Sequence, residues 1–189
     1  MVTVGILALQ GDVREHAAAV RSVGAEAVEV RTPTDLDGID ALVIPGGEST
    51  TIGRLARLYG LIDPLRKHIR SGLPTLGTCA GMIFLASATT EREQDQLGVL
   101  DATVERNAFG RQNESFEADL EVDGLDEPVH GVFIRAPWIE SVGSEVDVLA
   151  TWADHPVMVR QGNVLATSFH PELIGDARIH GMLVDLVEA

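Results

Sequence analysis

The spacing of hydrophobic and polar positions changes about halfway along the chain. Before residue 90, apolar runs of strand length alternate with segments whose apolar positions recur every three or four residues. The run VTVGILAL, residues 2–9, is typical of a strand buried on both faces of a parallel sheet. The segment 12–25 places its apolar residues on one helical face and stops at Gly24, which predicts an amphipathic helix.

The same alternation continues through the first half of the chain. We expect strands at 25–31, 39–47 and 73–79, helices at 49–60 and 61–72, and a further helix in AGMIFLASAT, 80–89. Strands separated by helices predict an α/β fold: a doubly wound, mixed but mainly parallel sheet flanked by helices in three flavodoxin-like layers. In such folds, ligands bind at the carboxyl ends of the strands.

From Leu97 onward, short strand-like runs punctuated by turn residues replace this alternation. They fall at 97–106, 115–124, 128–137, 146–154, 155–161 and 162–171. We expect them to add antiparallel or mixed strands to the same sheet, and the apolar stripe of 174–189 to form a helix that covers it. Because no repeat, low-complexity tract or linker interrupts the chain, the sequence predicts a single domain, 1–189.

Charge narrows the range of partners. The chain has 29 Asp and Glu against 14 Lys and Arg, a net charge of -15, and Lys67 is its only lysine. Nucleic acid is disfavoured as a partner, because phosphate binding needs a basic surface. The acidic residues are dispersed, and such a surface repels itself at low ionic strength. We therefore prefer a halophilic, salt-accumulating source, with an ordinary acidic enzyme as the alternative.

Two further features concern the cellular compartment. No apolar run reaches eighteen residues, and the first residues lack the pattern of a secretory signal. A single cysteine cannot form an internal disulfide, which agrees with a reducing compartment. The expectation is a cytoplasmic protein without a membrane span.

That cysteine, Cys79, lies where a predicted strand meets a predicted helix. Gly77 and Gly81 flank it at minus two and plus two, and remove side chains that would clash in a strained turn. Amides at the start of the helix would favour a thiolate and a developing oxyanion. A nucleophile elbow and a buried structural cysteine explain this pattern equally well.

A second strand end carries His170 and Glu172 in the sequence SFHPEL. In an extended segment, residues two apart point to the same side, so an imidazole and the carboxylate that orients it could act together. For His-Pro-Glu alone, a satisfied polar histidine is the commoner explanation. The other histidines show no metal-ligand spacing, so no metal site is predicted.

A third strand ends at Gly46-Gly47. Glycines let backbone amides approach a ligand, so this pair could donate an N–H to an oxyanion opposite Ala80. An ordinary turn capped by Ser49 would have the same sequence. All three candidate elements end predicted strands, as a site at the carboxyl edge of a parallel sheet requires, and this coincidence favours catalysis.

Three motifs in this order resemble those of class I glutamine amidotransferases: PGGES at 45–49, GTCAGM at 77–82 and HPE at 170–172. Within that class, the chain is most similar to the glutaminase subunits of pyridoxal 5'-phosphate synthase. This likeness covers essentially the whole chain and rests on GILALQGDVREH, PGGESTTIGRL, GTCAGMI, RNAFGRQNESFEADL and GVFIRAP.

The resemblance implies hydrolysis of L-glutamine to L-glutamate and ammonia, without a cofactor. The ammonia would pass to a separate barrel-shaped synthase subunit within a large hetero-oligomer that makes pyridoxal 5'-phosphate. By this resemblance, Cys79 attacks the side-chain amide, His170 moves the proton and Glu172 orients His170. The backbone amides of Gly47 and Ala80 would surround the oxyanion.

The resemblance also assigns substrate recognition. The residues it implies are Gly47, Glu48, Ser49, Arg106, Ile134 and Arg135. This set is chemically reasonable, because the α-ammonium of glutamine calls for an acid and its α-carboxylate for a guanidinium. Which arginine binds the carboxylate stays open, and a surface ion pair is the alternative for both.

Gln10 follows the first predicted strand, where a plain turn residue is one explanation. In the family that this chain resembles, the glutamine lies near the oxyanion loop and the contact with the synthase. Such glutaminases are poorly active until the partner docks. We therefore expect the isolated chain to be nearly inactive, with the Gly46-Gly47 oxyanion peptide unformed.

Alternatives to this assignment come from other classes of protein. One is a glutaminase subunit of another biosynthetic amidotransferase, for purine, histidine or guanine nucleotide synthesis. Another is a non-glutaminase protein with a cysteine elbow and a similar fold, which would not need Arg106, Arg135 and the His-x-Glu pair together. A purely structural subunit is a third.

Overall fold

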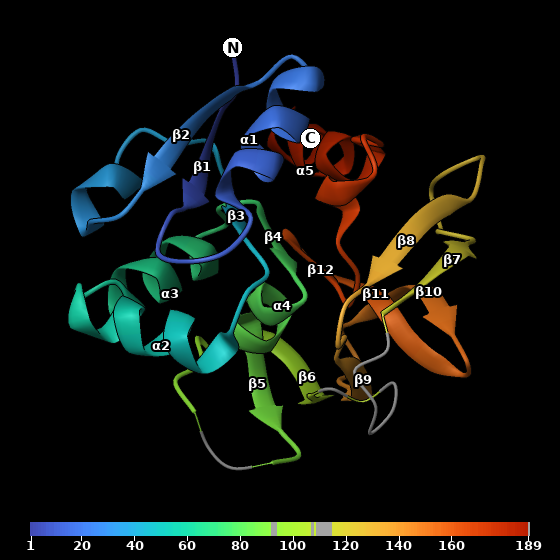
Figure 1. The fold of residues 1–189 in the computed structure, drawn as a ribbon. Helices are drawn as coiled ribbons and strands as arrows, with labels where there is room; N and C mark the ends of the chain where they lie inside the picture. Colours follow the sequence, from blue (N-terminus) through green and yellow to red (C-terminus); the bar gives the residue numbers. More distant parts are fainter. Residues whose placement is uncertain (92–93, 107, 109–114, 189) are drawn as a thin grey trace.

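The computed structural model describes residues 1–91, 94–106, 108 and 115–188 and is built around a seven-stranded sheet (Figure 1). The strands of this sheet are β1 (Thr3–Leu7), β2 (Glu26–Val30), β3 (Ala41–Ile44), β4 (Thr75–Thr78), β10 (Asp147–Trp152), β11 (His155–Gln161) and β12 (Val164–Thr167). Their order is β10-β11-β12-β4-β3-β1-β2. The strands from β12 to β2 run parallel, and β10 and β11 add an antiparallel hairpin at one edge.

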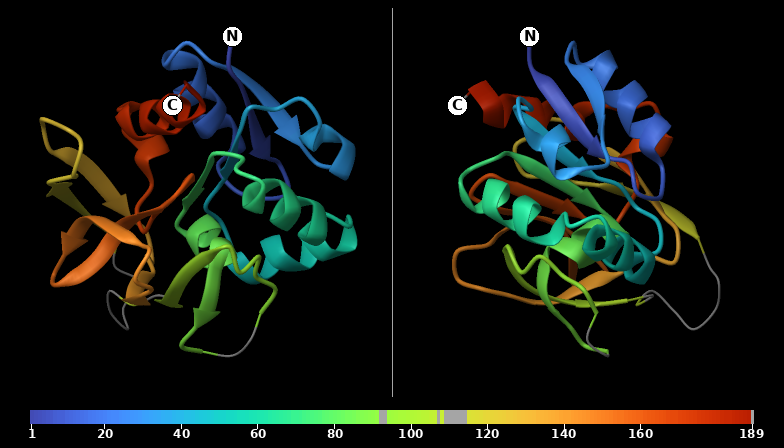
Figure 2. Two further views of the ribbon diagram at one scale, coloured as in Figure 1. Left: turned by 180° about the vertical axis from the view of Figure 1, so that it is seen from behind. Right: turned by 90° about the vertical axis from the view of Figure 1, so that its left-hand side faces the viewer.

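Helices cover both faces of the sheet (Figure 2). The α-helices are α1 (Val13–Ser22), α2 (Ser49–Leu58), α3 (Ile62–Arg70), α4 (Ala80–Leu85) and α5 (Arg178–Glu188), and short 3-10 turns span η1 (Pro33–Leu36) and η2 (Pro171–Leu173). Side chains of a strand alternate between faces, so Ala41 and Val43 of β3 pack beneath α1 and α5, whereas Leu42 and Ile44 pack beneath α2, α3 and α4. The predicted fold class is confirmed.

Of the strands expected to extend this sheet, β10, β11 and β12 do so, but those between residues 86 and 142 do not, and for them the expectation was wrong. β5 (Ala86–Thr89), β6 (Leu100–Glu105) and β9 (Trp138–Val142) form a separate sheet, and β7 (Phe116–Leu120) pairs with β8 (Val129–Phe133) in a two-stranded sheet. Apolar side chains on one face of each strand explain this arrangement. Those of β6 pack on the core beneath α2 and α3, whereas those of β7 and β8 pack on the core beneath α1 and α5.

The helix that follows Cys79 is shorter than AGMIFLASAT suggested. α4 ends at Leu85 and the chain enters β5 at Ala86. The N–H groups of Leu97 and Val99 donate to the carbonyls of Phe84 and Leu85, at 2.7 and 3.0 Å. Backbone groups from residues 97–99 therefore satisfy the end of the helix, and no continuation is needed.

The loops that carry the candidate residues follow four neighbouring parallel strands. In the order β12-β4-β3-β1, these loops contain His170, Cys79, Gly47 and Gln10. Because the carboxyl ends of parallel strands meet at one edge, the sheet brings the four loops together, as expected. Within the described ranges, no helix combines the length and apolar character needed to cross a membrane.

Candidate active site

Cys79 occupies a strained turn between β4 and α4. Its backbone has φ 50° and ψ -106°, a left-handed conformation that costs a side-chain-bearing residue on the order of 1–3 kcal/mol. The N–H of Cys79 donates to the carbonyl of Thr167 at 2.7 Å, which joins the elbow to the end of β12. The cysteine is free and only 7% exposed. A nucleophile elbow has this geometry.

Glycines around the elbow allow backbones and rings to approach closely. A Cβ at Gly81 would collide with the carbonyl oxygen of Ile44, and one at Gly77 would lie 2.9 Å from the backbone of Gly81. A Cβ at Gly46 would lie 2.5 Å from Cε1 of His170 and 3.4 Å from Cβ of Cys79. The predicted reason for glycine at the elbow is confirmed, and Gly46 is needed for the same reason.

His170 and Glu172 form a buried pair. Nδ1 of His170 lies 2.7 Å from Oε1 of Glu172, whose side chain is fully buried. The two side chains meet across the 3-10 turn η2, which begins at Pro171, and not along an extended segment as expected. Proline at the first position of a helical turn fixes φ without losing a needed hydrogen bond, which explains the difference.

The electrostatics of His170 favour its charged form. Burial alone would lower the pKa of His170, but hydrogen bonds with Cys79 and Glu172, and their charges, outweigh burial and raise that pKa from 6.5 to about 10. Because Nδ1 faces Glu172, Nε2 is the nitrogen left to exchange a proton with Cys79. His170 is therefore equipped to hold and deliver a proton at neutral pH.

Asp12 stands at the start of α1, but its side chain makes no capping hydrogen bond. Its Oδ2 lies 3.6 Å from Nδ1 of His170 instead. Asp12, His170 and Glu172 form a group whose possible ligand atoms all lie within 4.8 Å of one another. Both carboxylates face the same nitrogen of His170, which donates to Glu172 and so has no lone pair for a cation. This set orients an imidazole better than it binds a metal.

A pocket of about 100 Å³ opens beside Cys79 and unites all the sequence-predicted recognition residues. Its lining consists of Gly47, Glu48, Ser49, Cys79, Ala80, Ile83, Arg106, Ile134, Arg135 and Pro137. Pockets for drug-sized ligands are commonly about 300 Å³ or more, so this one suits a small metabolite. It combines a nucleophile, a carboxylate and two guanidiniums.

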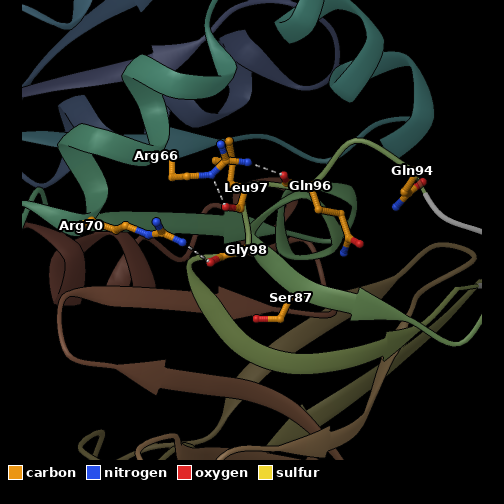
Figure 3. A pocket seen from close by; sticks show the side chains of 7 residues that line it. All are labelled: Arg66, Arg70, Ser87, Gln94, Gln96, Leu97 and Gly98. Atoms are coloured by element: carbon orange, nitrogen blue, oxygen red, sulfur yellow. Dashed lines mark hydrogen bonds between the residues drawn. The ribbon is translucent and has the colours of Figure 1, made fainter.

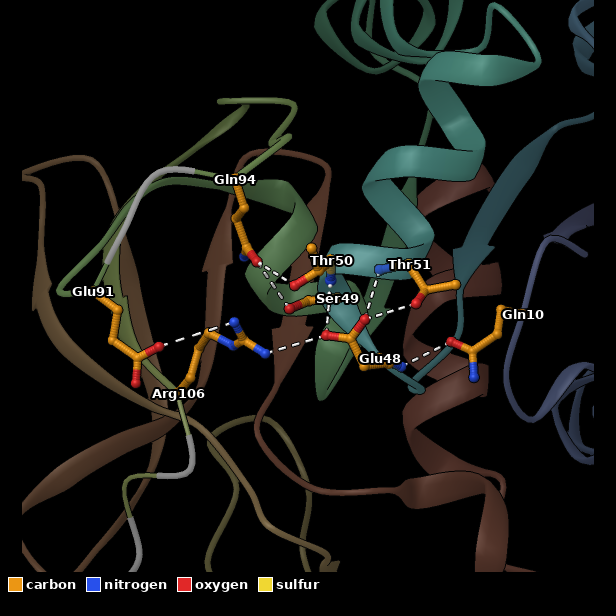
Figure 4. Close-up of polar contacts among 8 residues, drawn as sticks. All are labelled: Gln10, Glu48, Ser49, Thr50, Thr51, Glu91, Gln94 and Arg106. Atoms are coloured by element: carbon orange, nitrogen blue, oxygen red, sulfur yellow. Dashed lines mark hydrogen bonds and ion pairs between the residues drawn. The ribbon is translucent and has the colours of Figure 1, made fainter.

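Glu48 lines this pocket on the side of α2 (Figure 4). Its carboxylate caps α2 by accepting from the N–H groups of Thr50 and Thr51, so the cap is Glu48 and not Ser49 as proposed from the sequence. Burial would raise the pKa of Glu48, yet hydrogen bonds from Thr51 and Thr50 lower it from 4.5 to about 2. The carboxylate therefore stays negative over the physiological range.

The two arginines of the pocket differ in their partners. NH2 of Arg106 lies 3.2 Å from Oε1 of Glu48, and its NH1 lies 3.9 Å from Oε2 of Glu91 (Figure 4). Arg135 has a left-handed backbone, with φ 45°, and forms no ion pair with any residue in the described part of the chain. Ile134, 37% exposed, precedes it. Among the described residues, Arg135 therefore has fewer ion-pair partners than Arg106.

Gln10 lies directly against the Gly46-Gly47 loop, the neighbour that the resemblance implied for it. Its Oε1 accepts from the N–H of Glu48 at 2.8 Å, and a Cβ on Gly47 would press on its amide group. Gly47 has φ 152°, which disfavours residues with side chains. The N–H of Gly46 donates to Oγ1 of Thr78 at 3.1 Å, so this amide already has an acceptor. Of the two glycines considered from the sequence as donors to an oxyanion, Gly47 is therefore the better candidate.

The sequence interpretation missed the residues behind the His170–Glu172 pair. His16 of α1 and His180 of α5 are fully buried and hydrogen-bonded to each other. A signal for His16 was available, because it lies three residues after Val13 and four before Val20, on the apolar stripe of its helix. A histidine on such a stripe is expected to be buried.

A second, larger pocket of about 530 Å³ lies between α3 and residues 94–98 (Figure 3). Its guanidiniums bind backbone carbonyls: Arg66 those of Gln96 and Leu97, and Arg70 that of Gly98. Among the described residues that line it there is no cysteine, histidine or carboxylate. The pocket at Cys79 is therefore the candidate active site.

Comparison with known proteins agrees with this geometry. The family model described as the SNO glutamine amidotransferase family matches residues 6–189. This chain belongs to that family. It is 58% identical, over 188 residues, to the pyridoxal 5'-phosphate synthase subunit PdxT of Mycobacteroides abscessus, a match that covers 98% of this chain and 97% of that one. The family motif at 106–120 includes residues 107 and 109–114, which lie outside the described residues.

Solved structures give the same result. A crystal structure of a glutamine amidotransferase superposes with a TM-score of 0.94 at 57% identity, covering 98% of this chain and 99% of that one. A putative GMP synthase subunit from Thermoplasma acidophilum superposes with a TM-score of 0.73 at 19% identity, covering 100% and 94%. The latter likeness shows a shared fold alone, so the SNO family members are the informative relatives.

Proposed function

We propose that this chain hydrolyses L-glutamine to L-glutamate and ammonia with a Cys79–His170–Glu172 triad, and supplies the ammonia to a synthase subunit that forms pyridoxal 5'-phosphate. The observation that carries this proposal is the strained Cys79 elbow beside the 2.7 Å His170–Glu172 pair, at the floor of a pocket lined by Glu48 and Arg135. Family membership and full-length similarity to PdxT proteins support it.

In the acylation half of the proposed reaction, Sγ of Cys79 attacks the side-chain amide carbon of glutamine, and the thiol proton resides on Nε2 of His170. The carbonyl oxygen becomes an oxyanion that accepts from the N–H groups of Gly47 and Ala80. As the first residue of α4, Ala80 has an N–H without an acceptor inside its helix. His170 then protonates the departing nitrogen, and ammonia leaves a glutamyl thioester on Cys79.

In the second half, water attacks the thioester while His170 accepts its proton. Collapse of the tetrahedral intermediate releases glutamate and returns the proton to the Cys79–His170 pair. Glu172 stabilises the imidazolium in both halves, because Nδ1 donates to it throughout. No step consumes anything except glutamine and water.

The pocket supplies recognition groups for both ends of the amino acid. The carboxylate of Glu48 complements the α-ammonium, and Arg135, which has no described ion pair, complements the α-carboxylate. Arg106 holds Glu48 in place at 3.2 Å and also lines the pocket. Gly47, Ser49 and Ile134 also line the pocket.

Partner-dependent activity is part of the proposal. The peptide groups on either side of the Gly46-Gly47 peptide are anchored, since the N–H of Gly46 donates to Thr78 and that of Glu48 donates to Gln10. The peptide between them can rotate while its neighbours stay fixed. Docking of the synthase at the Gln10 loop would then set the N–H of Gly47 toward the oxyanion.

The competing assignments are a glutaminase for another synthase and a cysteine-elbow protein without glutaminase activity. Identity of 58% to a PdxT protein against 19% to the GMP synthase relative favours the pyridoxal phosphate assignment over the first. Glu48, Arg106 and Arg135 gathered around Cys79 favour a glutaminase over the second. We further propose a cytoplasmic location and a large assembly with the synthase, without nucleic acid or membrane.

Glutamate release from L-glutamine tests this function. The assay compares wild type and Cys79→Ala, each alone and with the cognate synthase subunit. We expect release only by wild type with the synthase, and loss of roughly 10⁴-fold or more in the variant. High turnover by the lone chain would contradict partner dependence. A folded complex that releases no glutamate would contradict the function itself.

A further inference from the structure

Two fully buried histidines lie directly behind the carboxylate of Glu172. Nε2 of His16 lies 3.5 Å from Oε2 of Glu172 and 3.1 Å from Oγ1 of Thr78. Nδ1 of His16 lies 2.9 Å from Nε2 of His180. These imidazoles come from α1 and α5, outside the loops that carry the proposed triad.

The charge state of His16 follows from its surroundings. Burial, together with the neighbouring imidazoles of His180 and His170, lowers the pKa of His16 well below 6.5. Burial lowers the pKa of His180 to about 4. Both rings are therefore neutral at physiological pH, and each has one N–H and one bare nitrogen.

Hydrogen bonding selects one tautomer of each ring. If Nε2 of His16 were bare, its lone pair would face the carboxylate of Glu172, and the N–H of His180 at Nδ1 would be buried without a described partner. Buried unpaired N–H groups are rare and costly. With the proton on Nε2, His16 donates toward Thr78 and Glu172, and His180 donates from Nε2 to His16. Each N–H of the two rings then has an acceptor, and what is left without a described partner is a bare nitrogen of His180 and the hydroxyl proton of Thr78.

Oε2 of Glu172 is the other atom that needs this donor. It is buried, and it has no partner within ordinary hydrogen-bond distance among the described residues. Nε2 of His16 lies 3.5 Å away. Oε1 is already hydrogen-bonded to His170. A neutral donor beside Oε2 orients the carboxylate without adding a second positive charge that would compete with the His170 imidazolium.

Thr78 extends the same contact to the oxyanion loop. Its hydroxyl oxygen accepts from the N–H of Gly46 and lies 3.1 Å from Nε2 of His16. Thr78 also precedes Cys79 in the chain. One imidazole thus touches the carboxylate of the triad and, through one hydroxyl, the peptide before Gly47.

We infer that His16, held in its Nε2–H tautomer by His180, is a positioning residue for the reaction: it orients Glu172 directly and the Gly46 peptide through Thr78. This inference rests on the proposed glutaminase function. It assigns a polar role to a side chain that lies on the apolar stripe of α1, where packing alone would suit Leu or Phe better.

Substitutions at His16 separate a polar role from a packing role. His16→Gln keeps an N–H donor near the position of Nε2, whereas His16→Leu keeps only volume. In the complex with the synthase, we expect His16→Leu to lower kcat by about 10- to 100-fold with KM nearly unchanged, as loss of an orienting partner does. His16→Gln should recover about tenfold of that loss, although burial of an amide makes it the less stable variant by thermal melting.

A matched pair at Thr78 tests the same contact from the other side. Thr78→Ser keeps the hydroxyl, and Thr78→Val keeps the shape without it. We expect Ser to retain activity within about threefold and Val to lose about tenfold in kcat, the value of one hydrogen bond. This pair decides the question if His16→Leu does not fold.

Wild type and Cys79→Ala belong in the same assay. No release by the wild-type complex would overturn the proposed function, and this inference with it. Release by wild type with equal kcat for folded His16→Leu and His16→Gln would overturn the inference alone. Equal kcat for Thr78→Val and Thr78→Ser would do the same. A KM effect without a kcat effect would also contradict a positioning role.

Discussion

The parallel strands and the strands added between residues 86 and 142 contribute different groups to one pocket. The parallel strands present Cys79, His170, Gly47 and Gln10 in loops that β12, β4, β3 and β1 place side by side. The added region contributes Arg106 after β6, and Ile134 and Arg135 after β8. The proposed chemistry thus sits on the sheet that fixes it, and recognition sits on segments that pack over it.

The two regions also differ in how tightly the backbone is constrained. Around Cys79, three glycines stand where any Cβ would meet a backbone or a ring. In the added region, Gly98 and Gly124 have no heavy atom within 4 Å of such a Cβ, and the atoms nearest to a Cβ at Gly131, 3.0 Å away, belong to side chains. Contact with a backbone carbonyl, as at Gly81, is the tighter constraint, and the comparison can be tested one substitution at a time.

The largest effect is expected from Gly81→Ala. The new methyl group would collide with the carbonyl of Ile44, which cannot move because β3 lies within the sheet. We expect a loss of about 3 kcal/mol or more in the free energy of unfolding, measured by denaturant titration. Gly181→Ala is the control, since a Cβ there meets nothing within 4 Å and α5 should gain about 0.5–1 kcal/mol. Equal stability of the two variants would refute the constraint at the elbow.

The next effect concerns recognition. Arg135→Gln and Arg106→Gln should each raise KM for glutamine by about 10- to 100-fold and leave kcat within about threefold, because a hydrogen bond to a charged group is worth about 1.5–3 kcal/mol. Arg31→Gln removes only a surface ion pair with Glu29 and should change neither parameter. A fall in kcat at constant KM would mean that the arginines act in the chemical step. It would contradict the claim that the added region serves substrate recognition and the parallel strands serve catalysis.

A smaller effect is expected in the pH dependence of the complex. The pKa of His170 is raised from 6.5 to about 10, so its proton is present below pH 10 and is lost as pH rises through that value. This pKa shift stabilises the folded chain. The stabilisation is complete below pH 6.5 and is lost as pH rises from there through about 10. In Glu172→Gln the carboxylate is gone, so the alkaline limb of kcat should move to lower pH.

Asp12→Asn provides a graded control for that profile. Asp12 lies 3.6 Å from Nδ1 of His170 and is partly exposed, whereas Glu172 lies at 2.7 Å and is buried. Its substitution should move the alkaline limb in the same direction but less far. A limb that stays in place in both variants would show that another group controls it.

The smallest effect concerns the acidic surface. His130 on β8 lies between Asp119 and Glu117 of β7, and its hydrogen bonds to these carboxylates raise its pKa. Because molar salt reduces the screening length to about 3 Å, molar KCl should lower that pKa toward 6.5, as followed by NMR titration. The melting temperature should rise by roughly 3–8 °C. A flat melting temperature would contradict the salt-adapted origin proposed from the net charge of -15.

Sequence patterns predicted the parallel part well, because a buried strand followed by an amphipathic helix leaves a strong periodic signal. The elbow at Cys79 was recognisable because glycines stand at fixed offsets from the cysteine, although the group that Gly81 must avoid, the carbonyl of Ile44, lies on the neighbouring strand. The 3-10 turn at Pro171 was not predicted, since His-Pro-Glu is compatible with both an extended and a turning backbone.

The added strands were harder to place. β6 and β7 have the alternating pattern of half-buried strands, but this pattern does not say which surface they cover. Their pairing depends on contacts distant in sequence, such as Phe116 with Phe133. The His16–His180 pair was missed because its side chains meet only in the folded chain. The cap at Glu48 was missed because serine is a commoner capping residue than glutamate, and Ser49 is the next residue.

The central claim is that Cys79 carries the substrate during turnover. The direct measurement is mass spectrometry of the chain after rapid acid quench of the complex reacting with L-glutamine. We expect a glutamyl group attached to the peptide that contains Cys79, with glutamate formed as it decays, and no adduct in Cys79→Ala. Turnover of glutamine without this adduct, or with an adduct on another residue, would contradict the account.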